Sequence, residues 1–515
     1  MTARRLQICF MLIFSCRAFA QVQHTPFTIV GYIQKFTLDT PGNLVSAGKM
    51  TVNGILVVIP INTIVVMPAT YLTPQDLFQG PHPTAGPGMT VLPQSGLALD
   101  EIKPQLAPYE AAIQGNIVGG VYIAGLMKIA QHSLNISSGY IQNINLTNGD
   151  VTVGPEPGST GPLVRLKLND PKVTGLSGGR YGRASSSEQD DRFTSDQDNP
   201  TIRSVTGYPM CVPRNAADAE CPQTNRPKDS AGKFSTQFTI GTVPQTPAAP
   251  ACSATGCNPK KQAPFEVGDY VTFSGTLAQD ATGVFVSAHT VTAWLGIFTS
   301  PGAPEAYLNI EVSLFGTGGV AFLGVTQEAG PGKAAPGQTI NTRLKVEGFT
   351  TDPSRNVDVI ALDFSSTAGT KDSKRERLLL TINPASKPIP LGRFRRQIDR
   401  SNFLPPSREL RVRIVGFAPD RKPNAAVANG ILTGEFTAPM GEFLFPENTT
   451  FGQPVVPMNF ENLCFLTRGS GPLTTLGRTS PIPVVGPLTP FPASGHLAPA
   501  PGSPPVAGQV VCPAL

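Results

Sequence analysis

The sequence predicts an all-β protein in which barrel-like β units are followed by a β-sandwich-like domain and a Pro-rich tail. Three observations predict this class. Apolar and polar residues alternate with period two in many short runs, as in half-buried strands. The pairs Asn53-Gly54 and Asn148-Gly149 separate such runs, and Asn-Gly favours the positive φ angles of a hairpin turn. Glycine and proline number 52 each, which suits short strands joined by turns.

Residues 1–20 have the three parts of a signal peptide. These are the basic residues Arg4 and Arg5, the apolar run 8–14 and the A-x-A cleavage site 18–20. Cleavage there leaves Gln21 as the new N-terminus. The apolar run is shorter than the about 20 residues that span a bilayer. A membrane anchor, or a lipoprotein signal cut before Cys16, is the alternative. We therefore expect a secreted, extracellular protein with no transmembrane segment.

Residues 21–330 are expected to form barrel-like β units. The expected strands are 27–36, 49–52, 55–59, 61–67, 140–146, 151–153, 163–168, 270–275 and 284–286. Thr73 followed by Pro74 predicts one of the few helix starts, because proline suits the first helical turn. The sequence Val267-Gly268-Asp269 leads into an alternating strand and resembles the strand entry of small closed barrels, including OB-like ones.

A long polar insertion, residues 175–263, interrupts this region. Segments of this length without secondary structure are usually functional or disordered. In an exported chain an even number of cysteines predicts disulfides, and six remain after the signal. Local pairing predicts Cys211 with Cys221, Cys252 with Cys257, and Cys464 with Cys512. No C-x-x-C pair is present, so a structural zinc site is the weaker alternative.

Residues 331–468 have the strand spacing of a sandwich-like domain. The expected strands are 342–346, 357–364, 377–382, 408–414 and 430–436. Residues 469–515 form a Pro-rich C-terminal tail, and its part from 471 on holds eleven prolines and a single charged residue, Arg478. Such a composition cannot build a core, so we expect the tail to be extended or disordered.

The overall charge argues against a nucleic-acid partner. Loss of Arg4, Arg5 and Arg17 with the signal lowers the formal net charge from +5 to +2. Nucleic-acid-binding domains are usually strongly basic. Three N-x-S/T sites, at Asn135, Asn145 and Asn448, would carry glycans in a eukaryotic host, so the chain is expected to be a glycoprotein there.

Residues 387–422 form the most basic segment, with ten basic and three acidic residues. Alternation places Arg411 and Arg413 on one outer strand face, and Arg393 and Arg395 likewise share a spacing of two. Arginines grip sulfate, carboxylate or phosphate groups through paired hydrogen bonds, so these four are candidate ligand-binding residues. The alternative is a charged outer face that only resists aggregation.

Acidic residues in the insertion suggest a metal site. Asp196 and Asp198 offer hard oxygen ligands at a spacing that suits Ca²⁺, although the EF-hand loop is absent. A solvated or arginine-paired loop is the alternative. No other cofactor is expected.

No catalytic constellation stands out. Ser177 lies in a G-x-S-x-G sequence, Gly175 to Gly179, but a Gly-rich polar stretch follows instead of the helix that a nucleophile elbow requires. We therefore expect no catalytic residue, and regard Ser177 as part of a loop.

The segments 192–200, 206–214 and 221–227, with Thr206-Gly207-Tyr208-Pro209-Met210 at their centre, resemble a region of secreted proteins of fungi and some bacteria for which no activity is known. The resemblance extends over much of residues 27–325. It implies export and a β fold, and no chemistry.

The expected function is that of an exported non-enzymatic β protein with a surface, matrix or binding role, its partner an extracellular acidic glycan or another cell-surface polymer. The alternative is a secreted hydrolase acting on polysaccharide or ester substrates. The oligomeric state is left open.

Overall fold

The Asn53-Gly54 turn closes the first hairpin of the computed structural model. It joins β2 (Gly48–Val52) to β3 (Ile55–Ile59), and the two turn residues have φ angles of 51° and 77°. Asn-Gly is favoured here because both positions of this turn require positive φ. The structure describes residues 24–82, 90–102, 105–131, 136–252, 257–320, 339–364, 374–384, 390–399, 408–418, 427–439, 463–467, 469–470 and 485–490.

The first barrel is built from five strands. They are β1 (His24–Leu38), β2, β3, β6 (Glu110–Val118) and β7 (Val121–Ala130). β1 pairs with β2 and β6, and β7 closes the ring by pairing antiparallel with β6 and parallel with β3. The short strands β4 (Val65–Val66) and β5 (Tyr71–Leu72) extend the sheet beyond β7. The expected helix is present as α1 (Pro74–Leu77), with Thr73 and Asp76 forming a capping box.

A second barrel repeats this connectivity. Its strands are β8 (Ile136–Ile144), β9 (Val151–Gly154), β10 (Val164–Leu168), β15 (Tyr270–Asp280) and β16 (Gly283–Ala293). β8, β9 and β10 form a meander, and β15 returns to pair with β8. β16 lies between β15 and β10 and runs parallel to β10. This is the connectivity of the five-stranded Greek-key OB barrel. The all-β, OB-like prediction is confirmed, and the expected barrel region contains two such barrels.

The polar insertion is the connection between the third and fourth strands of the second barrel. It holds β11 (Ile202–Ser204), β12 (Met210–Cys211), β13 (Gln237–Ile240) and β14 (Ala263–Pro264), and β13 pairs with β17 (Gly296–Thr299). Buried Tyr181, Tyr208 and Phe238 pack in the same hydrophobic cluster as the barrel strands. The described residues of the insertion therefore fold onto the barrel.

Two disulfides close turns within this insertion. Cys211 is bonded to Cys221 and Cys252 to Cys257, as the spacing predicts. Cys211 and Cys221 are buried. The predicted partner of Cys464, Cys512, lies outside the described residues, as does the expected signal peptide.

The C-terminal unit is a sandwich of two sheets. One sheet has the order β18 (Leu308–Val320), β19 (Thr339–Thr350), β22 (Arg393–Asp399). The other has the order β21 (Lys374–Ile382), β20 (Val357–Phe364), β23 (Glu409–Ile414), β24 (Glu435–Pro439). Leu344 and Phe394 of the first sheet pack with Val359 and Val412 of the second. Because β18 pairs with β19, the sandwich begins at Leu308 and not after residue 330.

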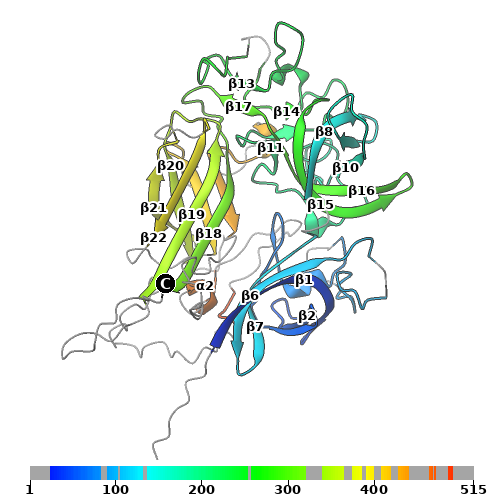
Figure 1. Ribbon diagram of the computed structural model, residues 1–515, viewed down its shortest axis with the longest axis vertical. Coiled ribbons are helices and arrows are strands. Elements are labelled where there is room, and N and C mark those ends of the chain that lie inside the picture. Colours follow the sequence, from blue (N-terminus) through cyan, green and yellow to red (C-terminus); the bar gives the residue numbers. More distant parts are fainter. Residues whose placement is uncertain are drawn as a thin grey trace, which may run out of the picture.

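Figure 1 shows the sandwich beside the second barrel, with the first barrel below both. Arg192 of the insertion joins the barrels, since its buried guanidinium donates to the carbonyl oxygens of Leu77 and Ser95 at 2.7 Å each. In the described part of the tail, Thr489 pairs with Ile61 of the first barrel. Within the residues described, no helix is long and apolar enough to cross a membrane.

Candidate functional site

Three aromatic side chains form a row across the outer wall of the second barrel. Strand register places Tyr270 of β15 opposite Tyr140 of β8. The backbone N–H of Trp294 donates to the backbone carbonyl oxygen of Tyr270 at 2.9 Å. The ring centroids of Tyr140 and Tyr270 are 5.1 Å apart, and those of Tyr270 and Trp294 are 6.2 Å apart, both edge to face. We call these three residues the aromatic row.

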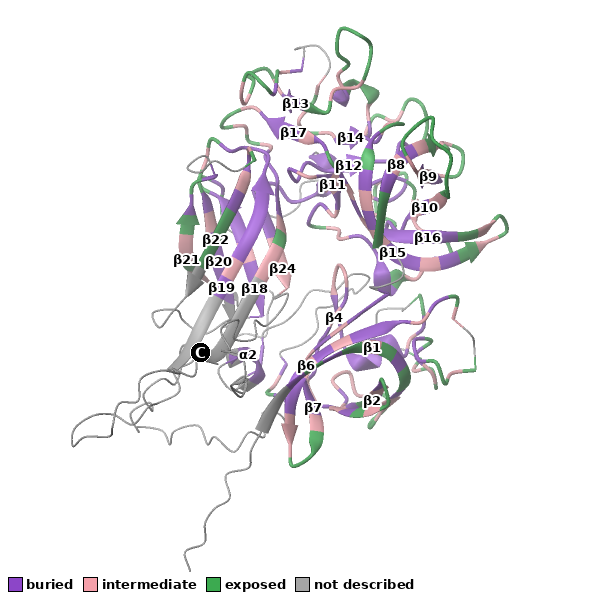
Figure 2. Ribbon diagram, viewed as in Figure 1, coloured by how far each residue is buried: buried purple, intermediate pink, exposed green. Residues whose placement is uncertain are grey.

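The aromatic row is open to solvent. Trp294 is 60% exposed and Tyr270 is 36% exposed, whereas Val271 and Phe273 on the opposite side of β15 are 0% and 2% exposed. Period-two alternation therefore separates a buried apolar face from an outer aromatic face. Figure 2 shows the exposed start of β8, which carries Ile136 at 60% exposure.

Hydroxyl side chains follow the aromatic row along the same wall. Thr272 of β15 lies opposite Ser138 of β8 and Thr292 of β16. We call these three residues the hydroxyl row. The Tyr270 hydroxyl donates to Ser138 Oγ at 2.9 Å, so the two rows are in contact. The wall thus presents aromatic ring surface beside groups that both donate and accept hydrogen bonds.

A cation ends the hydroxyl row. Arg203 of β11 lies beside Thr292 and donates to its Oγ1. Burial lowers the pKa of Arg203, and the nearby Glu311 carboxylate of β18 partly opposes this. Arg203 stays charged, because an arginine pKa remains far above neutral pH after such a shift.

Another wall of the same barrel, around β10 and the turn between β15 and β16, is occupied by an internal ion network. Arg165 donates to Asp150 at 3.2 Å and to Asp280 at 2.8 Å, and Lys167 lies 2.6 Å from Asp280. Both cations lie over the Phe285 ring. The hydrogen bonds from Arg165 and Lys167 hold the pKa of Asp280 well below its usual range. Two cations and two carboxylates balance here, so this wall lacks the net charge that attracts an ion.

Arg411 and Arg413 do share a face of β23, but that face is not an open one. Arg411 Nη1 lies 2.7 Å from Glu376, and Arg413 donates to both Glu376 and Glu435. The side chains of Arg413 and Glu435 are 9% and 0% exposed. The expectation of an outer, solvated face is therefore wrong, because carboxylates of β21 and β24 cover both arginines; ligand binding by them stays a prediction.

Arg393 and Arg395 of β22 lie around one carboxylate of the neighbouring strand, β19, in the same sheet. Glu347 of β19 lies 2.7 Å from Arg393, 3.0 Å from Arg395 and 3.1 Å from Lys345. Burial raises the pKa of Glu347, but the hydrogen bonds from Lys345 and Arg393 outweigh it and the pKa is lowered. Three cations thus share one carboxylate, and Arg395 is 55% exposed.

The acidic pair Asp196 and Asp198 forms part of a turn. Asp196 Oδ1 accepts from the N–H groups of Asp198 and Asn199 at 2.8 and 3.0 Å, and its Oδ2 accepts from the Asn199 side chain at 2.8 Å. Burial raises the pKa of Asp196 to about 6. Calcium binding here stays a prediction. Among the described residues, no group of three or more His, Cys, Asp or Glu side chains lies close enough to hold a metal ion.

Ser177 is exposed on a turn of the insertion, and no helix follows it. The surrounding glycines instead pack against a buried carboxylate: a Cβ added at Gly179 would lie 2.1 Å from Asp170 Cγ. The absence of a side chain at Gly179 in the G-x-S-x-G sequence therefore leaves space for the Asp170 carboxylate, which the loop encloses.

The aromatic row was missed in the sequence because its members are far apart along the chain. One signal was available. Trp294 is the sole tryptophan of the chain and directly follows the alternating residues Thr290 and Thr292, which places it on the same face. Only strand register shows that Tyr140 and Tyr270 lie beside it.

Comparison with known proteins gives no relative: no family model, no curated protein and no solved structure matches this chain. The resemblance of residues 192–227 to exported proteins therefore stays a prediction, and function has to be argued from the residues.

Proposed function

We propose that this is an exported binding protein that holds a polysaccharide on the outer wall of its second barrel. The observation that carries the proposal is the aromatic row with the hydroxyl row beside it. A pyranose ring has one apolar C–H face and a rim of hydroxyl groups. Such a ring packs on an aromatic face while its rim exchanges hydrogen bonds with Ser, Thr and Tyr hydroxyls.

The arrangement favours a polymer over a small molecule. The exposed side chains of Tyr270 and Trp294 lie side by side on the outer face of the sheet, so they offer contact along a chain. Small-molecule sites instead enclose most of the ligand. OB barrels bind oligosaccharides and oligonucleotides mainly on the face of their second and third strands, whereas the aromatic row lies on the first and fourth, so the proposal rests on the exposed side chains and not on the fold.

Cations on the sandwich would attract acidic groups on the polymer. Arg395 is exposed, and Lys345, Arg393 and Arg395 together outnumber Glu347. Such exposed charges contribute attraction that salt screens over about 8–10 Å. The preferred partner is therefore an extracellular acidic glycan, held by its ring faces on the barrel and steered by charge from the sandwich.

Export is part of the proposal. The signal-like residues 1–20 support it, and so do the two disulfides, which persist in oxidising compartments. N-terminal sequencing of secreted protein is expected to begin at Gln21. A mature chain beginning at Cys16 with a lipid attached would contradict it.

Affinity electrophoresis through gels that contain neutral or acidic polysaccharides tests the binding. We expect retardation by at least one polymer, and loss of it in Trp294→Ala. Tyr32→Ala is the matched control, because Tyr32 is also an exposed strand tyrosine, at 38%, but lies on the first barrel. Equal retardation of all three proteins contradicts the proposal. Release of reducing sugar from the gel polymers would instead support the hydrolase alternative.

A further inference from the structure

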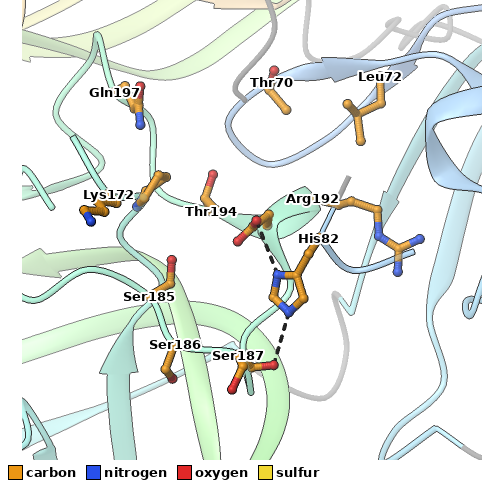
Figure 3. Close-up of a pocket in the computed structure, with 12 residues that line it drawn as sticks. Thr70, Leu72, His82, Lys172, Ser185, Ser186, Ser187, Arg192, Thr194 and Gln197 are labelled. Atoms are coloured by element: carbon orange, nitrogen blue, oxygen red, sulfur yellow. Dashed lines mark hydrogen bonds and ion pairs between the residues drawn. The ribbon is translucent and has the colours of Figure 1, made fainter. Parts of the chain in front are cut away.

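A pocket with both polar and apolar walls lies where the chain after β10 meets the first barrel. Its volume is about 510 Å³, within the roughly 300–1,000 Å³ of small-molecule sites. The first barrel contributes Thr70, Leu72 and His82. The chain after β10 contributes the remaining wall, with Lys172 just before the insertion and Ser185 and Thr194 within it. Figure 3 shows these side chains around the cavity, with His82 joined to Ser187.

His82 fixes one edge of the pocket. Its Nδ1 lies 3.3 Å from Asp191 Oδ2, and its Nε2 lies 3.1 Å from the Ser187 carbonyl oxygen. Burial lowers the pKa of His82, but the bonds to Ser187 and Asp191 outweigh it and the pKa is raised. With both ring nitrogens engaged, His82 holds the two units together and is not free to act as a general base.

In the described part of the chain, two of the three cations at the pocket are paired with carboxylates, and the third is not. Asp191 is paired with His82, and Asp190 with Arg192 at 2.7 Å. Lys172 lines the pocket and forms no ion pair with any residue that the structure describes. A ligand with a single negative charge would complement it.

One hydroxyl in the wall lacks a hydrogen-bond partner. Thr194 is 2% exposed, and its Oγ1 has no partner in the described structure. A buried polar group without a partner costs about 1–3 kcal/mol. Such an atom on the wall of a cavity marks the place where a ligand group would bind.

We propose that this pocket binds a small hydroxylated carboxylate of the size of a sugar acid, with its carboxylate at Lys172 and a hydroxyl group at Thr194. Ser185 and Gln197 in the same wall offer further hydrogen bonds to hydroxyl groups. This site is separate from the aromatic row and takes a single sugar unit, so it does not depend on polymer binding.

Isothermal titration calorimetry of the mature protein with D-glucuronate, D-glucose and sulfate tests this. We expect D-glucuronate to bind at least about tenfold more tightly than either other probe, because only it carries both charge and hydroxyl groups. Equal affinity for D-glucose would refute the role of the charge. Equal affinity for sulfate would refute the role of the hydroxyl groups.

Two variants locate the ligand. Lys172→Gln is expected to weaken D-glucuronate binding about tenfold or more, and Thr194→Val about 3- to 10-fold. Thr194→Val also removes an unpartnered hydroxyl, so the ligand-free variant should unfold at no lower temperature than the wild type. Lys49→Gln, an exposed lysine of β2 outside the pocket, is the control and should bind as the wild type does. Unchanged binding in both pocket variants would overturn the proposal.

Discussion

Tyr270 and Trp294 stand edge to face on the outer wall of the second barrel, with ring centroids 6.2 Å apart and both rings open to solvent. Large aromatic residues are normally at least partly covered in a folded monomer, and contiguous exposed ones mark an interaction site. Their backbones are joined by the Trp294 N–H bond to the Tyr270 carbonyl oxygen, so the pair is held on a rigid sheet. A rigid aromatic surface loses little conformational entropy on binding.

The first prediction concerns the buried disulfide. Replacing both Cys211 and Cys221 by Ala should lower the free energy of unfolding by about 2–4 kcal/mol, because the bond limits the unfolded chain and both cysteines lie in the core. Urea denaturation measures the loss. Replacing Cys252 and Cys257 should cost less, since Cys257 is only partly buried. A smaller loss at the buried pair than at this second pair would contradict the prediction.

The second prediction concerns Asp170, whose carboxylate accepts from the N–H groups of Arg180 and Tyr181 at 3.0 and 2.7 Å. Burial raises the pKa of Asp170, whereas its hydrogen bonds and the charge of Arg214 lower it. The effect of burial is the larger, and the pKa is raised to about 7. The folded protein thus holds the proton more tightly than the unfolded chain. The stability that Asp170 contributes is present below about pH 4 and is lost as the pH rises through about 7.

Asp170→Asn should remove this dependence. Relative to the variant, the wild type should lose free energy of unfolding, on the order of 4 kcal/mol, between about pH 4 and 7, with no further change above. Chemical denaturation of both proteins at several pH values measures it. A stability difference that is independent of pH, or a wild type that gains with rising pH, would be incompatible with the raised pKa.

The third prediction concerns Arg413. Arg413→Ser should cost about 3–5 kcal/mol, because it leaves Glu435 buried without its main partner. Adding Glu435→Gln should recover part of this loss, since the uncompensated buried charge is then gone. Thermal unfolding measures both. A single variant as stable as the wild type would mean that the ion pair is not formed.

The fourth prediction separates charge attraction from stability at Arg395. Arg395→Ser should change the free energy of unfolding by less than about 0.5 kcal/mol, because the side chain is mostly exposed. Retention on a heparin column at low salt should nevertheless decrease. Identical elution of the two proteins, or no retention of either, would show that this cluster is only a solvated face.

Local sequence signals predicted the fold well. Asn53-Gly54 and the Thr73 cap each specify a local geometry that does not depend on distant residues, and both are present. The covering of Arg413 by Glu435 could not be predicted, because it depends on which strand lies beside β23. The pocket between Lys172 and His82 likewise joins segments of two barrels, and no pattern in the sequence connects them.

The central claim, that the aromatic row binds a polysaccharide, is tested most directly by the intrinsic fluorescence of Trp294. The chain contains no other tryptophan, so the emission reports this side chain alone. Trp294 is 60% exposed, and a sugar ring packed on it would displace water from the indole. Titration with the polysaccharide that retards the protein should give a saturable shift of the emission to shorter wavelength, and Tyr270→Ala should raise the apparent dissociation constant about tenfold or more. Binding that leaves the Trp294 emission unchanged would contradict the account.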